Sequence, residues 1–161
     1  MKRLTIIRHG EAAAPPQGKT DFERPLNNRG RQEARKVAQQ LSHDDFNFDQ
    51  LFCSTAQRAL TTGQIIHQSF EPNKRPLVAV QALYNFDLDP LYRFIEMIEN
   101  DIQHAVIVAH NPALSYLAND LLGRPVRGMG TCTAIQMQLN IEQWVDIQSR
   151  CGQLLAIHTP H

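Results

Sequence analysis

The chain has 161 residues, of which 42% are hydrophobic, and its 16 acidic and 16 basic residues give a net charge of zero. This length and apolar content suit a single folded domain over residues 1–161 with a sizeable core. The balanced charge argues against bulk binding of nucleic acid or of an anionic membrane, because both need a basic excess.

The amino-terminal residues do not resemble a secretory signal. Only four apolar residues, 4–7, follow the basic start, whereas a signal core needs about 7–15 and a membrane span about 20. The three cysteines, Cys53, Cys132 and Cys151, are widely separated and odd in number. That pattern fits reduced intracellular thiols better than a disulfide framework or a zinc site. We therefore expect a cytoplasmic monomer.

The first half of the chain alternates strand-like and helix-like patterns. Residues 4–7, 51–53 and 77–80 are predicted as strands. After a loop over residues 14–25, a helix is predicted to start near Asn27 or Asn28, and Ser54 and Thr55 are candidate N-caps of the next helix. The positions expected to face inward on these two helices are Ala34, Val37, Ala38, Leu41, Ala59, Ile66 and Phe70.

The second half repeats the alternation. Asp89-Pro90 and Asn111-Pro112 each combine an N-cap residue with a first-turn proline, so each predicts a helix start. Gly123 is expected to close the second of these helices. Strands are predicted over residues 105–109, 135–139, 143–149 and 152–158.

Repeated alternation of strand and helix predicts an α/β fold with right-handed crossovers. The mostly parallel central sheet would be covered by helices on both faces, as a three-layer α/β/α sandwich. Ligands of such sheets bind beyond the carboxyl ends of the strands.

Basic side chains follow three of the predicted strand ends. The first strand runs into Arg8 and His9, the second leads to Arg58 in the first turn of a helix, and the strand over 105–109 runs into His110. Helix amino termini add unpaired N–H groups to the same edge of the sheet. The cluster is suited to binding a dianion such as a phosphoryl group.

Structural alternatives exist for each of these residues. Either histidine can be a hydrogen-bonded structural group, and Gly10 can simply permit a tight turn. Arg58 opposes the helix dipole and so needs an anionic partner, which a neighbouring carboxylate could supply. A zinc site built on His9 and His110 lacks a third ligand at diagnostic spacing.

Four ordered motifs resemble the histidine phosphatase superfamily, which contains the phosphoglycerate mutases. Residues 7–11 resemble its R-H-G-E signature, and residues 25–30 its P-L-T-x-x-G helix entry. Residues 54–62 are similar to its S-x-x-x-R-A-x-x-T motif, and residues 108–112 to its second-histidine motif. The resemblance implies a phosphoglycerate mutase-like fold and no metal or organic cofactor.

The same resemblance implies roles for four residues. His9 would be the nucleophile, Arg8 and Arg58 would bind the phosphoryl oxygens, and His110 would donate a hydrogen bond to them. These roles agree with phosphoryl-transfer chemistry, which needs an activated nucleophile and neutralised equatorial oxygens. Oxyanions in general are therefore expected to bind here.

The leaving group separates the possible activities. Members that cleave ordinary phosphomonoesters need a general acid, usually a carboxyl group after the third strand. Here Asp89 is explained as an N-cap, which leaves Asp87 as the candidate acid. A phosphohistidine substrate would need much less protonation, because its leaving group is an imidazole.

Short loops also predict an open pocket, with few residues between positions 11 and 27 and between positions 83 and 90. An open pocket suits a protein substrate. The chain thus resembles the SixA-type phosphohistidine phosphatases, whose substrate would be a phosphohistidine-bearing protein, for example a phosphotransfer domain. Two alternatives stay open: a small-molecule phosphomonoesterase using Asp87, and a binding module for phosphate or phosphohistidine without turnover.

Overall fold

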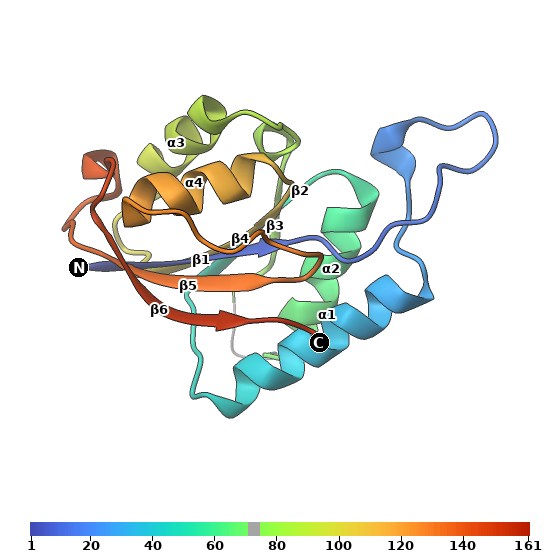
Figure 1. Ribbon diagram of the computed structural model, residues 1–161, viewed down its shortest axis with the longest axis horizontal. Coiled ribbons are helices and arrows are strands. Elements are labelled where there is room, and N and C mark those ends of the chain that lie inside the picture. The colour runs from blue at the N-terminus through green and yellow to red at the C-terminus, as the bar shows by residue number, and fades with distance from the viewer. Residues whose placement is uncertain (71–74) are drawn as a thin grey trace.

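Six strands form one sheet in the order β3-β2-β4-β1-β5-β6, in a computed structural model that describes residues 1–70 and 75–161 (Figure 1). The strands are β1 (Lys2–Arg8), β2 (Gln50–Ser54), β3 (Val78–Val80), β4 (His104–Ala109), β5 (Ala134–Leu139) and β6 (Gly152–His158). The helices are α1 (Asn28–His43), α2 (Gln57–Gln68), α3 (Leu88–Glu96) and α4 (Ala113–Leu122). Single 3-10 turns occur at Asp21–Glu23, Gln81–Leu83 and Trp144–Asp146.

The sheet is mostly parallel, as the alternation of elements predicts. Strand β4 pairs in parallel with both β1 and β2, and β2 with β3, whereas β5 and β6 are antiparallel to their neighbours. The two central strands, β1 and β4, therefore end at the same edge. Residues 9 and 110 follow these ends, so the topology alone brings them together.

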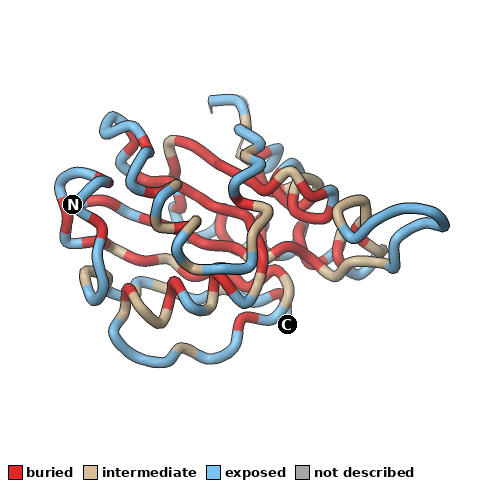
Figure 2. Tube along the Cα trace, turned by 90° about the horizontal axis from the view of Figure 1, so that it is seen from above, coloured by how far each residue is buried: buried red, intermediate tan, exposed pale blue. Residues whose placement is uncertain are grey.

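The two faces of the sheet carry different helices, α3 and α4 on one side and α1 and α2 on the other (Figure 1). Along β1, Leu4 and Ile6 pack with the first pair of helices and Ile7 with the second. This division follows from the two-residue period of a strand. Figure 2 shows buried residues running along the strands between the two layers. The predicted three-layer α/β/α sandwich is confirmed.

Helix α1 begins where the sequence predicts, but α2 does not. Asn27 caps α1 by accepting a hydrogen bond from the Gly30 N–H at 2.8 Å. The predicted capping role of Ser54 and Thr55 is wrong, because the N-cap of α2 is Ala56. Ser54 is the last residue of β2, and its hydroxyl lies in the site described below.

The helix starts at Asp89 and Asn111 also need correction by one or two residues. Asp87 occupies the N-cap position of α3, and Asp89 lies in the first turn, where a carboxylate is favoured by the helix dipole. Pro112 occupies the N-cap position of α4. The Asn111 side chain still accepts the Ser115 N–H at 3.2 Å, so it bonds to the first turn from one residue further out.

The strand predicted over residues 143–149 is wrong, whereas that over 152–158 is confirmed as β6. Trp144 and Ile147 are buried and Val145 is exposed, a three-residue spacing that fits the 3-10 turn at Trp144–Asp146. The Trp144 indole N–H donates to the Ile102 carbonyl at 2.8 Å, which fixes this turn against the loop before β4. Gly123 closes α4 in the left-handed region (φ 67°), as predicted.

Two glycines allow the loop after β1 to pack directly on the start of α1. A Cβ on Gly10 would lie 2.7 Å from the Gly30 carbonyl oxygen, and one on Gly30 would lie 2.1 Å from the Glu11 carbonyl oxygen. Real side chains do not tolerate such distances to backbone atoms. The requirement is therefore close approach between two backbone segments, rather than the tight turn considered for Gly10 from the sequence.

We predict that Gly30→Ala lowers the free energy of unfolding by about 1–3 kcal/mol, the usual range for overpacking. Alanine gains about 1 kcal/mol of helix propensity, but the backbone clash outweighs it. Urea unfolding measures the change, and Gly128→Ala is the control, because a Cβ there meets nothing within 4 Å. A Gly30→Ala protein as stable as the wild type would show that the loop can move away at no cost.

Candidate active site

The four basic residues singled out from the sequence lie together at the carboxyl edge of the sheet. Arg58 Nε is 3.4 Å from His9 Nε2, and the ring centroids of His9 and His110 are 5.2 Å apart. Above them is a cavity of about 350 Å³. Its lining residues are Arg8, His9, Glu11, Ala12, Asp21, Arg24, Arg58, Phe86, Asn111 and Thr131.

A backbone carbonyl decides which nitrogen of His9 carries the proton. Nδ1 lies 2.7 Å from the Gly10 carbonyl oxygen, which can only accept, so Nδ1 carries the proton. Nε2 then presents its lone pair toward Arg58, whose Nε–H donates to it. An imidazole held in this tautomer has the geometry of a nitrogen nucleophile.

Thr62 joins the His9 loop to α2. Its hydroxyl donates to the Arg58 carbonyl at 2.7 Å and accepts the Gly10 N–H at 3.0 Å. The same side chain therefore sets the position of α2, which carries Arg58, relative to the loop that carries His9. This explains structurally why the threonine of the motif over residues 54–62 lies four residues after the arginine.

Both histidines are neutral near neutral pH. Burial, helped by the charges of Arg58 and Arg8, outweighs the opposing effect of the Gly10 hydrogen bond and lowers the pKa of His9 to about 4. Burial, His9 and Arg58 lower the pKa of His110 to about 3. His9 therefore keeps its lone pair at Nε2 under physiological conditions.

Arg58 has the carboxylate partner that its position requires. Its side chain is 4% exposed, and its Nη2 lies 3.0 Å from Asp21 Oδ2 while Nη1 donates to the Asp21 carbonyl. Arg24 and the Tyr84 hydroxyl also bond to the Asp21 carboxylate, at 3.2 and 2.8 Å. Partial burial would raise the pKa of Asp21, but the hydrogen bonds from Tyr84, Arg24 and Arg58 outweigh it and lower the pKa to about 2.

Arg8 and His110 each retain an unused nitrogen. Arg8 Nη1 donates to the Met129 carbonyl at 3.0 Å, but its buried Nε has no hydrogen-bond partner in the described part of the chain. The buried His110 Nδ1 also lacks one there. Buried polar atoms are normally paired, so these two indicate a ligand site.

Asp87 and Cys53 do not belong to this group. Asp87 is exposed at the start of α3 and is not among the residues that line the cavity. Cys53 is buried in the core beneath the site, and burial raises its pKa to about 12, so its thiol stays protonated.

Sequence reasoning missed three polar residues of the site: Asp21, Arg24 and Glu33. The first two lie in the loop before α1, where no periodicity predicts which side chains face inward. Glu33, buried on α1, accepts the Glu11 N–H at 2.9 Å and the Thr131 hydroxyl at 2.7 Å. Glu33 could have been found from the sequence, because it is a charged residue next to Ala34 on the predicted inner face of α1.

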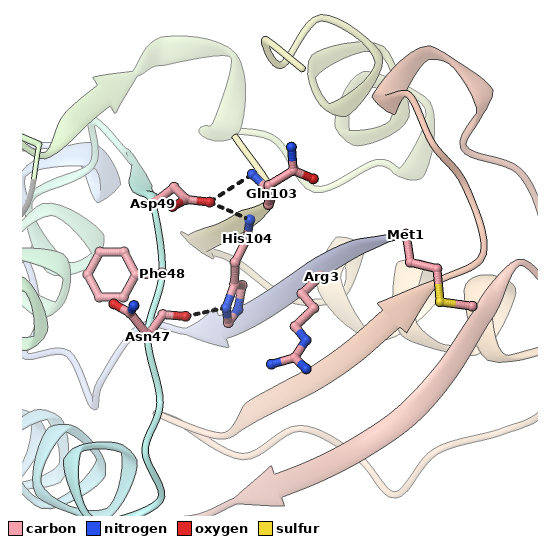
Figure 3. Close-up of a pocket in the computed structure, with 7 residues that line it drawn as sticks. All are labelled: Met1, Arg3, Asn47, Phe48, Asp49, Gln103 and His104. Atoms are coloured by element: carbon pink, nitrogen blue, oxygen red, sulfur yellow. Dashed lines mark hydrogen bonds between the residues drawn. The ribbon is translucent and has the colours of Figure 1, made fainter. Parts of the chain in front are cut away.

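A second hollow, of about 300 Å³, lies at the amino ends of β1 and β4 (Figure 3). Asp49 there accepts the N–H groups of Gln103 and His104 at 2.7 and 2.9 Å, and His104 also bonds to the Asn47 carbonyl. These contacts join the loop before β2 to the start of β4. We assign them a structural role.

Among the described residues, no three or more His, Cys, Asp or Glu side chains are grouped closely enough to hold a metal ion. None of the helices over residues 1–70 and 75–161 is long and apolar enough to cross a membrane.

Comparison with known proteins identifies the family. The model of the histidine phosphatase superfamily (branch 1) matches residues 4–91, more than half of the chain. The chain therefore belongs to the histidine phosphatase superfamily. An uncharacterized protein of Mycobacterium leprae is 26% identical over 172 residues, covering 96% of this chain and 99% of the relative.

Solved structures share the fold over nearly the whole chain. The putative phosphohistidine phosphatase SixA from Agrobacterium tumefaciens has a TM-score of 0.81 at 22% identity, covering 99% of both chains. A protein histidine phosphatase SixA complexed with tungstate also has a TM-score of 0.81, at 21% identity over 98% of this chain and 97% of that one. A putative alpha-ribazole-5'-P phosphatase from Escherichia coli has a TM-score of 0.72 at 18% identity, with 99% and 97% covered. Family and fold support a phosphatase, while the similar structures differ in substrate.

We predict that His9 stays neutral, with its proton on Nδ1, down to about pH 5. An unfolded histidine takes up a proton below about pH 6.5. With the pKa of His9 lowered to about 4, His9 contributes stability above pH 6.5 that is lost as the pH falls toward 4. NMR of ¹⁵N-labelled histidine in the ligand-free protein measures the titration. A midpoint near 6.5 for His9 would contradict the buried, neutral nucleophile.

Proposed function

We propose that this chain hydrolyses phosphohistidine on a protein substrate through a phospho-His9 intermediate. The observation that carries the proposal is the pairing of a neutral His9, which lines the cavity and has an unprotonated Nε2, with an ionised Asp21 in place of a proton donor. Such a site can accept a phosphoryl group, but it offers little help to a leaving group that must be protonated.

In the first step, His9 Nε2 attacks phosphorus in line with the leaving imidazole. A nitrogen–phosphorus bond forms at His9 as the bond to the substrate's imidazole breaks, and a substrate that carries a proton on its other ring nitrogen releases a neutral imidazole. Arg8 and Arg58 lie where they can neutralise charge on the equatorial oxygens, and His110 can donate a further hydrogen bond. Arginine suits this role because it binds oxyanions bidentately and keeps its charge.

In the second step, water attacks the phospho-His9 phosphorus, inorganic phosphate leaves, and His9 returns to the neutral form. The Gly10 carbonyl still holds the proton on Nδ1. When the nitrogen–phosphorus bond breaks, its electron pair therefore stays on Nε2, and no external acid is needed to protonate His9. The intermediate and the proposed substrate share the same kind of bond. A site able to cleave one therefore has the groups needed to cleave the other.

Neither of the carboxylates that line the cavity, Asp21 and Glu11, is placed to protonate a leaving group. Asp21 is ionised by its three hydrogen-bond donors, so it cannot protonate an alkoxide. Glu11 is held at the start of α1, where its two oxygens contact Asn27 Nδ2 at 3.0 Å and Arg29 Nε at 3.3 Å. An imidazole leaving group tolerates this lack of a ready acid better than an alkoxide does.

The loops around the site leave room for a protein. Residues 14–20 are exposed and form a loop that projects beyond the body of the molecule, on the right in Figure 2. Phe86, 42% exposed, borders the cavity and offers an apolar surface beside it. These features favour a substrate whose phosphohistidine reaches in from a larger surface.

The two alternatives are weaker on specific grounds. A phosphomonoesterase using Asp87 would need that side chain at the cavity, but Asp87 is not among the lining residues. A module that only binds phosphate would not need a histidine whose Nε2 is held unprotonated beside the cavity. Binding could be met by Arg8, Arg58 and His110.

We predict that His9→Ala abolishes turnover, to below about one thousandth of the wild-type rate, because the variant lacks the nitrogen that forms the phospho-His9 intermediate. Tungstate binding should persist through the two arginines, which separates loss of the nucleophile from loss of the fold. His43→Ala, an exposed histidine at the end of α1, is the matched control. Activity above a tenth of wild type in His9→Ala would remove the nucleophile assignment.

We also predict that a phosphohistidine protein or peptide is cleaved about 10²–10⁴ times faster than a phosphoserine peptide of equal length, the usual contribution of a general acid. Values of kcat/KM for the two substrates measure the ratio. Asp87→Asn, compared with Asp89→Asn on the same turn, should leave both rates unchanged. Similar rates for both substrates, with a large loss in Asp87→Asn, would favour the phosphomonoesterase. Binding of phosphohistidine without any turnover would favour the module.

A further inference from the structure

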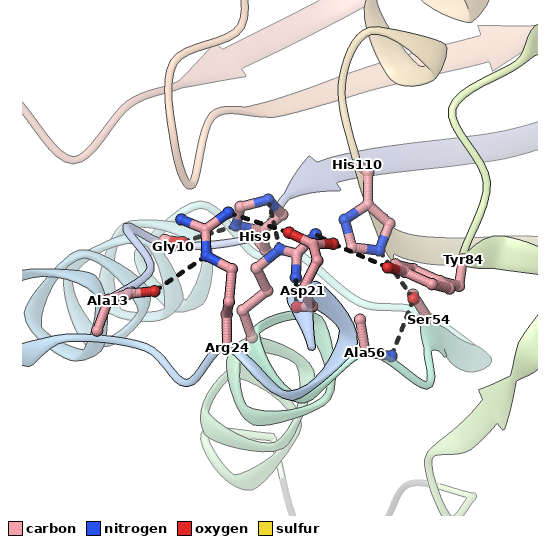
Figure 4. A network of polar contacts seen from close by, with 10 residues as sticks. His9, Gly10, Ala13, Asp21, Arg24, Ser54, Ala56, Tyr84 and His110 are labelled. Atoms are coloured by element: carbon pink, nitrogen blue, oxygen red, sulfur yellow. Dashed lines mark hydrogen bonds and ion pairs between the residues drawn. The ribbon is translucent and has the colours of Figure 1, made fainter. Parts of the chain in front are cut away.

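His110 is enclosed on all but one edge. It is 1% exposed, and the rings of Tyr84 and Phe86 pack against it with centroids 5.4 Å away in each case. Its Nε2 lies 2.8 Å from the Ser54 Oγ. The other nitrogen, Nδ1, is on the ring edge that faces His9 and Asp21 (Figure 4). The ring therefore links a buried hydroxyl to the phosphoryl site.

Ser54 is fully buried, and its hydroxyl has a second contact. The Ala56 N–H donates to Ser54 Oγ at 3.2 Å. This bond uses a lone pair of the oxygen and leaves the hydroxyl hydrogen to find an acceptor. A serine hydroxyl has one hydrogen and two lone pairs, so its contact with His110 has two possible directions.

The two directions place the His110 proton on different nitrogens. If Ser54 donates to Nε2, the hydroxyl hydrogen is satisfied and the ring proton lies on Nδ1. If Nε2–H donates to Ser54, the hydroxyl accepts twice, and no acceptor for its own hydrogen is found among the described residues. In the ligand-free protein the first arrangement leaves only the Nδ1–H unpaired over the described part of the chain, whereas the second leaves both the hydroxyl hydrogen and the Nδ1 lone pair unpaired. Because each unpaired buried group costs free energy, the first arrangement is favoured.

The first arrangement also fits an oxyanion. Since burial, His9 and Arg58 lower the pKa of His110 to about 3, the ring carries a single proton. With that proton on Nδ1, the free nitrogen is a donor directed into the site. With it on Nε2, a lone pair would face the phosphoryl oxygens and repel them.

We propose that Ser54 is a positioning residue, whose hydroxyl donates to His110 Nε2 and thereby holds the ring proton on Nδ1 as a donor for the phosphoryl group. Ser54 acts through His110 and does not itself reach the ligand. The inference rests on the proposed function in one respect, namely that the ligand of the site is a phosphoryl group. It is independent of which leaving group the enzyme prefers.

The direct test is the tautomer of His110 by ¹⁵N NMR in the ligand-free wild-type protein, together with tungstate affinity. We expect a protonated Nδ1 and an unprotonated Nε2. In Ser54→Ala the Nδ1–H tautomer should lose its dominance, and tungstate affinity should fall about tenfold, the effect of losing one buried hydrogen-bond partner. Ser54→Thr restores the hydroxyl and should restore both readouts.

Thr55→Ala is the control, because it removes a neighbouring hydroxyl that bonds to Gln81 instead, at 2.6 Å. It should change neither the tautomer nor the affinity. A wild-type His110 protonated on Nε2 would overturn the inference, even if Ser54→Ala failed to fold. An unchanged tautomer in folded Ser54→Ala would overturn it too. An enzyme with the expected tautomer but no activity on phosphohistidine would remove the proposed substrate and leave this inference intact.

Discussion

The ion pair between Arg58 and Asp21 is the interaction on which the site depends. Arg58 is almost fully buried in the first turn of α2, where the helix dipole opposes its charge. A buried charge without a partner is strongly destabilising, and arginine cannot escape by losing its proton. Asp21 supplies the partner from a loop that is itself at the surface. The pocket can therefore keep its cation ready before any phosphoryl group arrives.

The two histidines of the site, His9 and His110, add no positive charge to it. Two charged histidines beside Arg8 and Arg58 would add repulsion to the site, but burial keeps both His9 and His110 neutral. Their hydrogen bonds then decide their chemistry: the Gly10 carbonyl leaves a lone pair on His9. The site thus combines fixed positive charge from arginines with two uncharged imidazole rings, within a few ångströms.

Much of this arrangement follows from the sequence, and the parts that do not have identifiable reasons. The apolar runs predicted the sheet, and its topology placed residues 9, 58 and 110 at one edge, because parallel strands end together. Cap assignments at Ser54 and Asn111 were displaced, since a polar residue beside a helix start can bond to other groups. Asp21 and Arg24 were missed because the loop before α1 has no periodicity, so their orientation depends on tertiary contacts. The need of Arg58 for a carboxylate was predictable, but not which carboxylate would supply it.

The charge state of Asp21 links the architecture to the substrate that we propose. A carboxyl group beside a developing alkoxide must be protonated to help it leave, and that requires a pKa raised by burial or by a neighbouring anion. Asp21 has the opposite environment, with two arginines and a phenol donating to it. The contacts that stabilise Arg58 therefore also prevent Asp21 from acting as an acid. One carboxylate cannot both stay ionised to stabilise Arg58 and be protonated to assist a poor leaving group. In this chain Asp21 stays ionised and stabilises Arg58.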